Sequence, residues 1–317
     1  MVITVTLNPA MDKTLCIDNF SLGKVNRSSK VRHDIGGKGI NVSKVLRNFD
    51  VDSICTGFLG GLWESYFLEE LKNRNIKTDF VSIKGATRTN TKIVDHLNRI
   101  YTDINEAGPE VSKEELDSFI GTFKELCKAG DIVVLSGGVG PGVPKDIYGT
   151  LIKIAKEKGA ITILDAEGPL LEEGIAQKPN VIKPNIHELE KLMGERYKSE
   201  YEVIKAGRIL VKQGIEKVLI SLGDKGALLV TKDAVYSCQG LKVPVKSTVG
   251  AGDSMVAALV YSIIKEFHQG DTLKFANACG AASVSIEGTE ACTLEQVNSL
   301  LELIEVHIKE VNGLIDR

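Results

Sequence analysis

The chain has 317 residues, of which 43% are hydrophobic and 26% are charged, and its 39 basic and 42 acidic residues give a formal net charge of −3. This composition provides enough apolar material for a buried core and excludes an intrinsically disordered chain. The slight excess of acidic residues also argues against a general nucleic-acid binder, which would carry a basic surface.

Short β-branched runs alternate along the chain with segments of helical period. Apolar residues spaced 3, 1 and 3 positions apart place one apolar face on a helix, first at 42–49 and again at 116–123. Nearly continuous apolar runs between such helices predict an α/β fold, whose mostly parallel sheet is buried on both faces. The strands of this sheet are predicted at 2–7, 132–135, 161–164, 181–183 and 218–222.

Two polar segments, at about 12–34 and 88–106, break this rhythm because they favour β structure and lack a helical period. We expect them to form a small second sheet outside the main layer. A hairpin is predicted at 227–245, followed by three helices that begin at Ala251, Thr272 and Leu294. No linker rich in Pro, Ser or Gly divides the chain. We therefore expect one domain over residues 1–317, with the small sheet as an inserted lid.

The six cysteines are scattered and form no Cys-x-x-Cys pair, which indicates buried free thiols in a reducing compartment. The first residues lack the basic lead of a signal peptide. No uncharged run approaches the roughly 18 residues that a membrane span needs. We expect a cytoplasmic protein with neither a membrane nor a nucleic acid as its partner.

The strongest chemical signal is the segment 248–254, Thr-Val-Gly-Ala-Gly-Asp-Ser, which precedes an apolar helix. Small residues let the backbone approach a ligand closely, and a helix start offers unpaired N–H groups and a partial positive charge. Together they can form an anion hole for a phosphoryl group in transfer. Asp253 could instead cap the helix, but the complete Gly-Ala-Gly-Asp sequence favours a catalytic site.

A second glycine-rich segment, Gly-Gly-Lys-Gly-Ile-Asn-Val at 36–42, leads into the first amphipathic helix. It is not a Walker A loop, because Gly39 follows the lysine where Ser or Thr is required, and it does not match the dinucleotide-binding pattern. Its glycines would let Asn41 and the backbone contact a polyhydroxylated ligand. Taken alone, the segment could equally be a simple tight turn.

These two segments, in this order and about 210 residues apart, resemble those of the PfkB (ribokinase-like) family of carbohydrate kinases. Five further segments fall where the family places comparable ones: Asn-Pro-Ala-Met-Asp at 8–12, Thr-Arg-Thr-Asn at 87–90, Ser-Gly at 136–137, Lys-Pro-Asn-Ile-His-Glu at 183–188 and Ser-Leu-Gly-Asp-Lys-Gly at 221–226. The resemblance covers essentially the whole chain. It implies a three-layer α/β/α sandwich with a mostly parallel central sheet and a small β lid.

The resemblance also implies a kinase that uses ATP and Mg²⁺. Asp253 would be the catalytic base that takes the proton of a sugar hydroxyl, and the backbone of Gly250, Ala251 and Gly252 would form the anion hole. A carboxylate suits this role, because a loose phosphoryl-transfer transition state needs a positioned proton acceptor more than a strong base.

The other matching residues would bind the two substrates. The sugar pocket would contain Asp12, Gly37, Lys38, Asn41, Arg88 and Ser136. The nucleotide would be bound by Lys183, Asn185, Glu188, Ser221, Gly223 and Gly226. Among these, Asn185 and Glu188 would help to organise Mg²⁺, which prefers oxygen ligands.

Residues 8–12 and 87–92 are similar to those of the family branch that acts on ketohexose monophosphates. Arg88 would hold the phosphate that the substrate already carries, with a solvated surface arginine as the alternative. Residues 102–105 resemble 1-phosphofructokinases, which convert fructose 1-phosphate to fructose 1,6-bisphosphate. Residues 108–111 also resemble tagatose-6-phosphate kinases. We expect the first activity, with conversion of tagatose 6-phosphate to tagatose 1,6-bisphosphate as the alternative.

Two other interpretations stay open. The chain could be a sugar-phosphate-binding regulator that lacks catalysis, although its intact Gly-Ala-Gly-Asp and Asn-x-x-Glu segments argue against this. It could also phosphorylate free sugars or nucleosides. In proteins that it resembles, the lid meets a partner subunit, which implies a homodimer through the lid.

Overall fold

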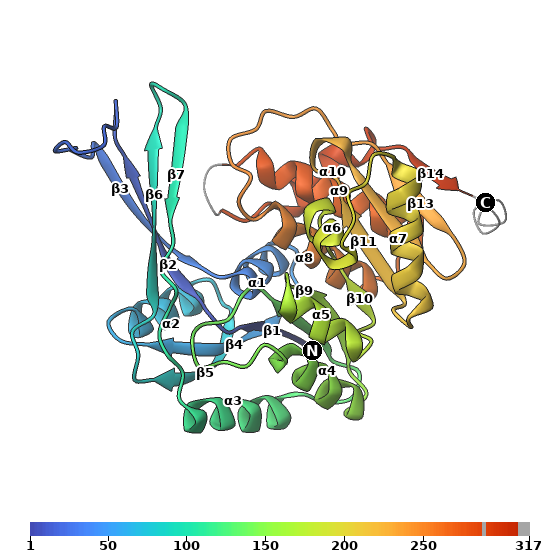
Figure 1. Cartoon of the computed structure of the whole chain (residues 1–317), viewed down its shortest axis with the longest axis horizontal. Coiled ribbons are helices and arrows are strands. Elements are labelled where there is room, and N and C mark those ends of the chain that lie inside the picture. The colour runs from blue at the N-terminus through green and yellow to red at the C-terminus, as the bar shows by residue number, and fades with distance from the viewer. Residues whose placement is uncertain (287–289, 310–317) are drawn as a thin grey trace.

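The structure is a computed structural model that describes residues 1–286 and 290–309. Ten strands form one large sheet with helices on both faces (Figure 1). In spatial order they are β14 (Val306–Lys309), β13 (Val235–Cys238), β12 (Ala227–Thr231), β11 (Lys217–Ser221), β10 (Val181–Ile182), β9 (Ile161–Asp165), β8 (Ile132–Ser136), β1 (Val2–Thr6), β4 (Ser53–Gly60) and β5 (Lys77–Ile83). Every neighbouring pair from β11 to β5 is parallel. The three pairs from β11 to β14 are antiparallel.

Two helical layers enclose this sheet. One layer contains α3 (Lys113–Leu126), α4 (Ile147–Glu157), α5 (Pro169–Ala176), α6 (Ile186–Met193) and α7 (Glu200–Lys212). The other contains α1 (Lys38–Asn48), α2 (Trp63–Asn73), α8 (Ala251–Ile264), α9 (Gln269–Val284) and α10 (Leu294–Leu301). The predicted three-layer α/β/α sandwich is therefore confirmed.

The five predicted strands of the large sheet match observed strands to within a residue at each end. β1, β8 and β12 are buried at every position, which explains their continuous apolar sequences. Local signals also set the helix ends. At the start of α3, the Ser112 hydroxyl accepts a hydrogen bond from the Glu115 N–H, and the Glu115 carboxylate accepts one from the Ser112 N–H. This capping box satisfies two N–H groups that the helix cannot.

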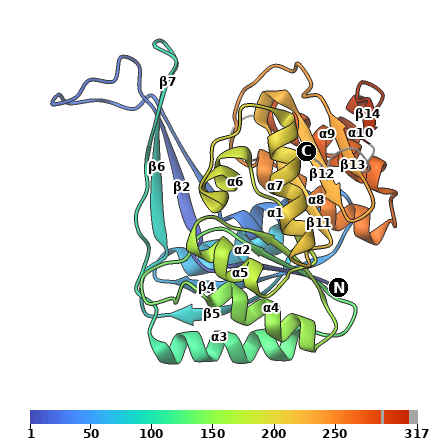
Figure 2. The same ribbon diagram turned by 45° about the vertical axis from the view of Figure 1, so that its right-hand side comes forward.

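A four-stranded sheet rises from one side of the molecule (Figures 1 and 2). Its strands, in spatial order, are β3 (Lys30–Gly36), β2 (Ala10–Cys16), β6 (Arg88–Asp95) and β7 (Ile100–Ile104). β2 pairs parallel to β6 and antiparallel to β3. All four lie in or beside the two segments that broke the helical rhythm of the sequence.

Two boundaries in the C-terminal third differ from the prediction. The hairpin ends at Cys238, and residues 239–250 run on without regular structure. α9 begins at Gln269 rather than Thr272, because His268 accepts a hydrogen bond from the Gly270 N–H and caps the helix. The short edge strand β14 was not predicted.

All six cysteines are free, and five of them are buried. Over the described ranges 1–286 and 290–309, no helix is long and apolar enough to cross a lipid bilayer.

Candidate active site

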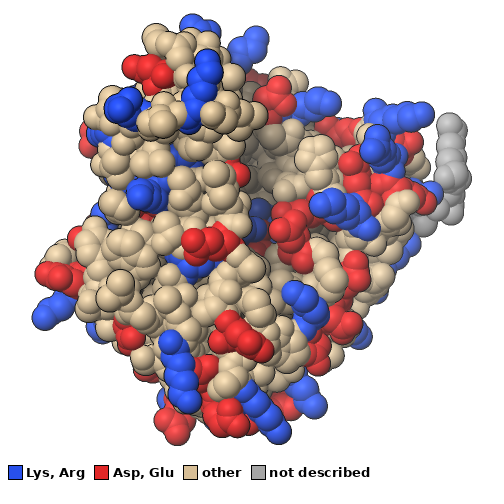
Figure 3. All heavy atoms as spheres, turned by 60° about the vertical axis from the view of Figure 1, so that its left-hand side comes forward, with Lys and Arg blue, Asp and Glu red and all other residues tan. Residues whose placement is uncertain are grey.

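A cavity of about 390 Å³ lies at the carboxyl ends of the parallel strands. β4 and β5 lie on one side of β1, whereas β8 to β11 lie on the other, so the chain changes direction along the sheet at β1. Open α/β sheets bind their ligands at such a switch point. Figure 3 shows a deep hollow in the surface, with Lys or Arg atoms visible inside it.

The structure brings most of the predicted site residues to this cavity. Its lining includes Asp12, Gly37, Lys38, Asn41, Arg88, Lys183, Asn185, Glu188, Ser221, Gly250, Gly252 and Asp253. Four residues that had been given no role also line it: Ala10, Asn90, Asp165 and Val249. Residues from the sugar and nucleotide sets thus share one space.

Four predicted residues lie just outside the lining. Ser136 is fully buried and its hydroxyl donates to Asp165 Oδ2 (3.3 Å). Gly223 begins a short 3₁₀ turn, and Gly226 ends it with a φ of +104°. A Cβ on Gly226 would lie 2.1 Å from the Cys238 carbonyl oxygen, so only glycine fits there. Ala251 is the first residue of α8.

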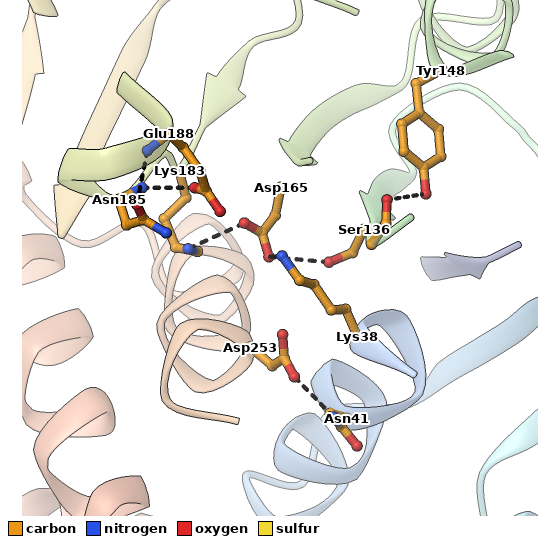
Figure 4. Close-up of polar contacts among 10 residues, drawn as sticks. Lys38, Asn41, Ser136, Tyr148, Asp165, Lys183, Asn185, Glu188 and Asp253 are labelled. Atoms are coloured by element: carbon orange, nitrogen blue, oxygen red, sulfur yellow. Dashed lines mark hydrogen bonds and ion pairs between the residues drawn. The ribbon is translucent and has the colours of Figure 1, made fainter. Parts of the chain in front are cut away.

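Asp253 lies in the first turn of α8 but does not cap it. The N-cap is Gly250, with a left-handed φ of +83°, and no side chain caps the helix. The Asp253 carboxylate reaches across to α1 instead, where Oδ2 accepts a hydrogen bond from Asn41 Nδ2 (2.8 Å; Figure 4). The capping interpretation is therefore wrong, and the carboxylate lies at the cavity.

The surroundings of Asp253 favour its protonated form. Burial raises its pKa to about 6, and the negative charge of Asp165 adds to this effect. Lys38, the Asn41 hydrogen bond and Lys183 act in the opposite direction. A carboxylate whose pKa lies close to neutrality is a better proton acceptor than an ordinary surface aspartate and is still ionised at pH 7.

The start of α8 presents positive charge to the same space. The Ser254 N–H donates to the Gly250 carbonyl (2.8 Å), so the N–H groups before it have no acceptor within the helix. Lys183 lies directly over this turn, since a Cβ on Gly252 would be 3.3 Å from Lys183 Nζ. A helix start with an ammonium group beside it is suited to bind phosphate.

Asp165 holds the two lysines of the site. Its carboxylate is 1% exposed and lies 3.4 Å from Lys38 Nζ and 3.1 Å from Lys183 Nζ (Figure 4). Burial would raise the pKa of Asp165, but Lys183 and then Lys38 lower it below its usual value. The same pairing raises the pKa of Lys38. Lys38 therefore stays charged at the cavity.

Asn185 and Glu188 form the capping box of α6. The Asn185 side chain accepts from the Glu188 N–H (2.9 Å), and Glu188 Oε2 accepts from the Asn185 N–H (2.8 Å). The three-residue spacing of this motif is therefore set by the helix start. Oε2 makes the cap, Oε1 takes no part in it, and Glu188 lines the cavity.

This donor set fits Mg²⁺ held jointly with a nucleotide, because Mg²⁺ is typically bound by one or two carboxylates, phosphate oxygens and water. In the described part of the chain no cluster of three His, Cys, Asp or Glu side chains could hold a metal by itself.

The sugar end of the cavity lies at the base of the small sheet. Asn90 Nδ2 donates to Asp12 Oδ1 (3.1 Å). A Cβ on Gly36 would lie 2.2 Å from Asp12 Oδ2, so any larger residue there would displace this carboxylate. Arg88 donates through NH1 to the Glu106 carbonyl (2.8 Å) and through NH2 to the Asn8 carbonyl (3.1 Å). Its Nε is buried and has no hydrogen-bond partner among the residues that the structure describes.

Sequence reasoning missed Asp165, although a usable signal was present. The residue ends β9, and side chains at the carboxyl ends of parallel strands point to the ligand site. The prediction of this strand stopped at 164, one residue short. Lys44 was also missed: it is 6% exposed and lies directly behind Asn41.

A family model described as pfkB family carbohydrate kinase matches residues 6–296. A 1-phosphofructokinase of Bacillus subtilis is 37% identical over 306 residues, which cover 96% of this chain and 99% of that protein. A tagatose-6-phosphate kinase of Staphylococcus epidermidis is 35% identical over 309 residues, with 96% and 99% covered.

The fold is also similar to that of a solved kinase structure. Phosphofructokinase-2 from Escherichia coli, in complex with substrates and products, superposes with a TM-score of 0.91 at 26% identity, covering 95% of this chain and 98% of that one. A tetrameric inhibited form of that enzyme superposes with a TM-score of 0.89. The sequence motifs, the fold and these similarities agree, and the chain belongs to the pfkB family of carbohydrate kinases.

Proposed function

We propose that the protein transfers the terminal phosphoryl group of ATP to fructose 1-phosphate and so forms fructose 1,6-bisphosphate. The observation that carries this proposal is the cavity itself, in which a buried carboxylate, a helix start and an arginine with an unpaired N–H meet. Phosphorylation of tagatose 6-phosphate to tagatose 1,6-bisphosphate is the second candidate. It is favoured by a relative of nearly equal similarity that bears that name.

Asp253 acts as the general base. The attacking sugar hydroxyl loses its proton to the carboxylate as its oxygen bonds to phosphorus and the bond from phosphorus to ADP breaks. Asn41 occupies Oδ2 of the carboxylate, so Oδ1 is the oxygen left to receive the proton. The reaction needs the base in place more than it needs a strong base.

The positive groups around Asp253 stabilise the phosphoryl group in transfer. The N–H groups at the start of α8 bind its oxygens, and Lys38 and Lys183 add two charges that Asp165 keeps in position. Such preorganised groups act in a water-poor site, where electrostatic interactions are strong. When bound, Mg²⁺ supplies further neutralisation of the nucleotide phosphates, and Asn185 and Glu188 would hold it.

Arg88 and Asp12 bind the acceptor. Arg88, which lines the cavity, binds the phosphate that the sugar already carries, and Asp12 accepts hydrogen bonds from sugar hydroxyls. Asn90 is in contact with Asp12 and keeps its carboxylate oriented. This division places the reacting hydroxyl between Asp12 and Asp253.

We also propose that the chain is a single kinase domain in which the small sheet acts as a lid. A closed lid would exclude water and limit hydrolysis of ATP.

Strand pairing puts Leu15, Val31, Ile93 and Ile104 on the face of this sheet opposite Asp12. These apolar residues support a homodimer through the lid. Free cysteines and a need for ATP fit a cytoplasmic enzyme.

A substrate panel tests the proposal. ADP release is measured with fructose 1-phosphate, fructose 6-phosphate, tagatose 6-phosphate, free fructose and ribose, and the kcat/KM values are compared. We expect the highest value for fructose 1-phosphate, whereas a higher value for tagatose 6-phosphate would select the second candidate. Binding without ADP release would indicate a regulator, and a preference for a free sugar would contradict the role of Arg88.

Arg88→Ala tests the role of this arginine separately, because the substitution should raise KM for sugar phosphates while leaving KM for ATP unchanged. Loss of a charge-assisted hydrogen bond of this kind corresponds to about 10-fold or more in affinity.

A further inference from the structure

Lys44 is a buried cation with no carboxylate in direct contact. It is 6% exposed, and no ion pair with it is formed within residues 1–286 and 290–309. Its Nζ donates to the Ile35 carbonyl (2.5 Å) and lies 3.5 Å from Asn41 Oδ1. Burying an ammonium group without a carboxylate partner destabilises a fold, so an apolar side chain of this length would make folding more favourable.

The position of Lys44 links two parts of the site. Ile35 is near the end of β3, where the small sheet joins the glycine-rich turn before α1. Asn41 lies one turn earlier on α1 than Lys44 and donates to Asp253 Oδ2 (2.8 Å). A chain of contacts therefore runs from the root of the small sheet through Lys44 and Asn41 to the proposed base.

The chemistry of these groups permits only one orientation of the Asn41 amide. An ammonium group can only donate, so the amide atom facing Lys44 must be oxygen. An ionised carboxylate can only accept, so the amide atom facing Asp253 must be NH₂. Both neighbours require the same orientation. If Lys44 were absent, Asp253 alone would orient the amide, and the amide could turn its oxygen to the carboxyl group whenever Asp253 is protonated.

We propose that Lys44 is a positioning residue that fixes the Asn41 amide so that it holds Asp253 Oδ2 and leaves Oδ1 for the sugar hydroxyl. The inference rests on the proposed kinase function and adds a residue to it. Lys44 does not touch either substrate in this assignment, since it does not line the cavity.

The charged groups around Lys44 and around Asp253 set the expected dependence of activity on pH. Burial and, after it, Arg74 lower the pKa of Lys44 to about 8, while Asp34, Asp12 and the Cys55 thiol act in the opposite direction. Around Asp253, Asp165 favours the protonated form, and Lys38, Asn41 and Lys183 favour the ionised form. Loss of the Asn41 hydrogen bond would therefore raise the pKa of Asp253 still further.

The test is a double-mutant cycle on the full-length protein with Lys44→Met and Asn41→Ala. Lys44→Met alone should lower kcat by about 10-fold or more, as small displacements of reacting groups do, with KM for ATP nearly unchanged. It should also move the acidic limb of the kcat/KM profile to higher pH. In the Asn41→Ala background, Lys44→Met should change kcat by less than about 2-fold, because residues acting through one another are not additive.

Lys44→Arg keeps a donor and should restore most of the activity. Arg47→Met, on the same helix but paired with Asp52 at the surface, is the matched control and should behave as wild type. If Lys44→Met does not fold, Lys44→Leu, which also lacks a donor, takes its place in the cycle and is interpreted in the same way.

An unchanged kcat and pH limb, or an equal loss in both backgrounds, would overturn this role for Lys44. A wild-type protein that releases no ADP with any sugar would instead contradict the kinase proposal.

Discussion

Asp253 lowers the stability of the fold in the same ionised form that its proposed function requires. Its folded-state pKa of about 6 exceeds the unfolded value of 3.8, because burial and Asp165 favour the protonated form. Both states are protonated below pH 3.8, so the residue has no effect on stability there. As pH rises from there through 6, the unfolded chain ionises first and the fold loses stability. The loss is about 3 kcal/mol at most, from 2.2 pKa units at 1.36 kcal/mol each.

Asp253→Asn should therefore give a protein that is more stable and much less active. Near pH 8 we expect its free energy of unfolding to exceed that of wild type by about 1–3 kcal/mol, and the difference should shrink towards pH 5. Its kcat should fall by about 10² to 10⁴, with little change in sugar binding. Urea denaturation and steady-state kinetics measure both quantities. Near-normal turnover would show that Asp253 is not the base.

Asp165 provides a second prediction at the residue scale. The proposed base works only when ionised, so kcat/KM should decline as pH falls through about 6. Removing the negative charge with Asp165→Asn should lower the pKa of Asp253 and move this decline to lower pH. The second pKa of a sugar phosphate also lies near 6, but it is common to both proteins, so only the difference between their profiles is used. A decline at the same pH would show that Asp165 does not act on Asp253.

The site depends on how α1 packs against β1, because the first turn of α1 carries both Lys38 and Asn41. A Cβ on Gly39 would lie 2.6 Å from the Val5 carbonyl oxygen and from Thr6 Oγ1. Gly39→Ala should thus push the helix from the strand, destabilise the fold by about 1–3 kcal/mol and reduce activity through both side chains.

Gly121→Ala is the control for this substitution. Gly121 lies within α3, and a Cβ there would meet no atom within 4 Å. Alanine in a helix interior is favoured over glycine by about 0.5–1 kcal/mol, so this variant should be slightly stabilised and fully active. Denaturant midpoints for the two variants on opposite sides of wild type would agree with the packing argument. A stable, active Gly39→Ala would contradict it.

The sequence predicted elements well where one local signal determined them. Continuous apolar runs identified the buried strands, and the spacing 3, 1 and 3 identified α1 and α3. It could not predict β14, a four-residue edge strand that exists only because β13 lies beside it. Asp165 was missed for a similar reason, because its partner Lys38 is 127 residues away and only the fold brings the two together. Lys44 lies three residues from Asn41 on the same helix, but its burial and its contact with Ile35 come from the fold.

The motif residues show what a resemblance between sequence segments cannot predict. Gly226 and Ser136 were predicted to contact ligands, and in the structure Gly226 shapes a turn and the Ser136 hydroxyl donates to Asp165. A resemblance between segments identifies a position in the site. It does not distinguish a residue that lines the cavity from one that holds its neighbour, because both requirements restrict the residue type equally.

At the scale of the whole molecule, the apolar face of the small sheet should form the dimer interface. Val31 and Ile104 are 46% and 54% exposed on its two edge strands, and Leu15 and Ile93 lie between them on the same face. Wild type should be a dimer by light scattering, and Val31→Asp with Ile104→Asp should be a monomer, because both substitutions would place buried charges at the interface. Leu303→Asp, at a position 65% exposed beyond α10, should stay dimeric. A double variant that remains dimeric would place the interface elsewhere.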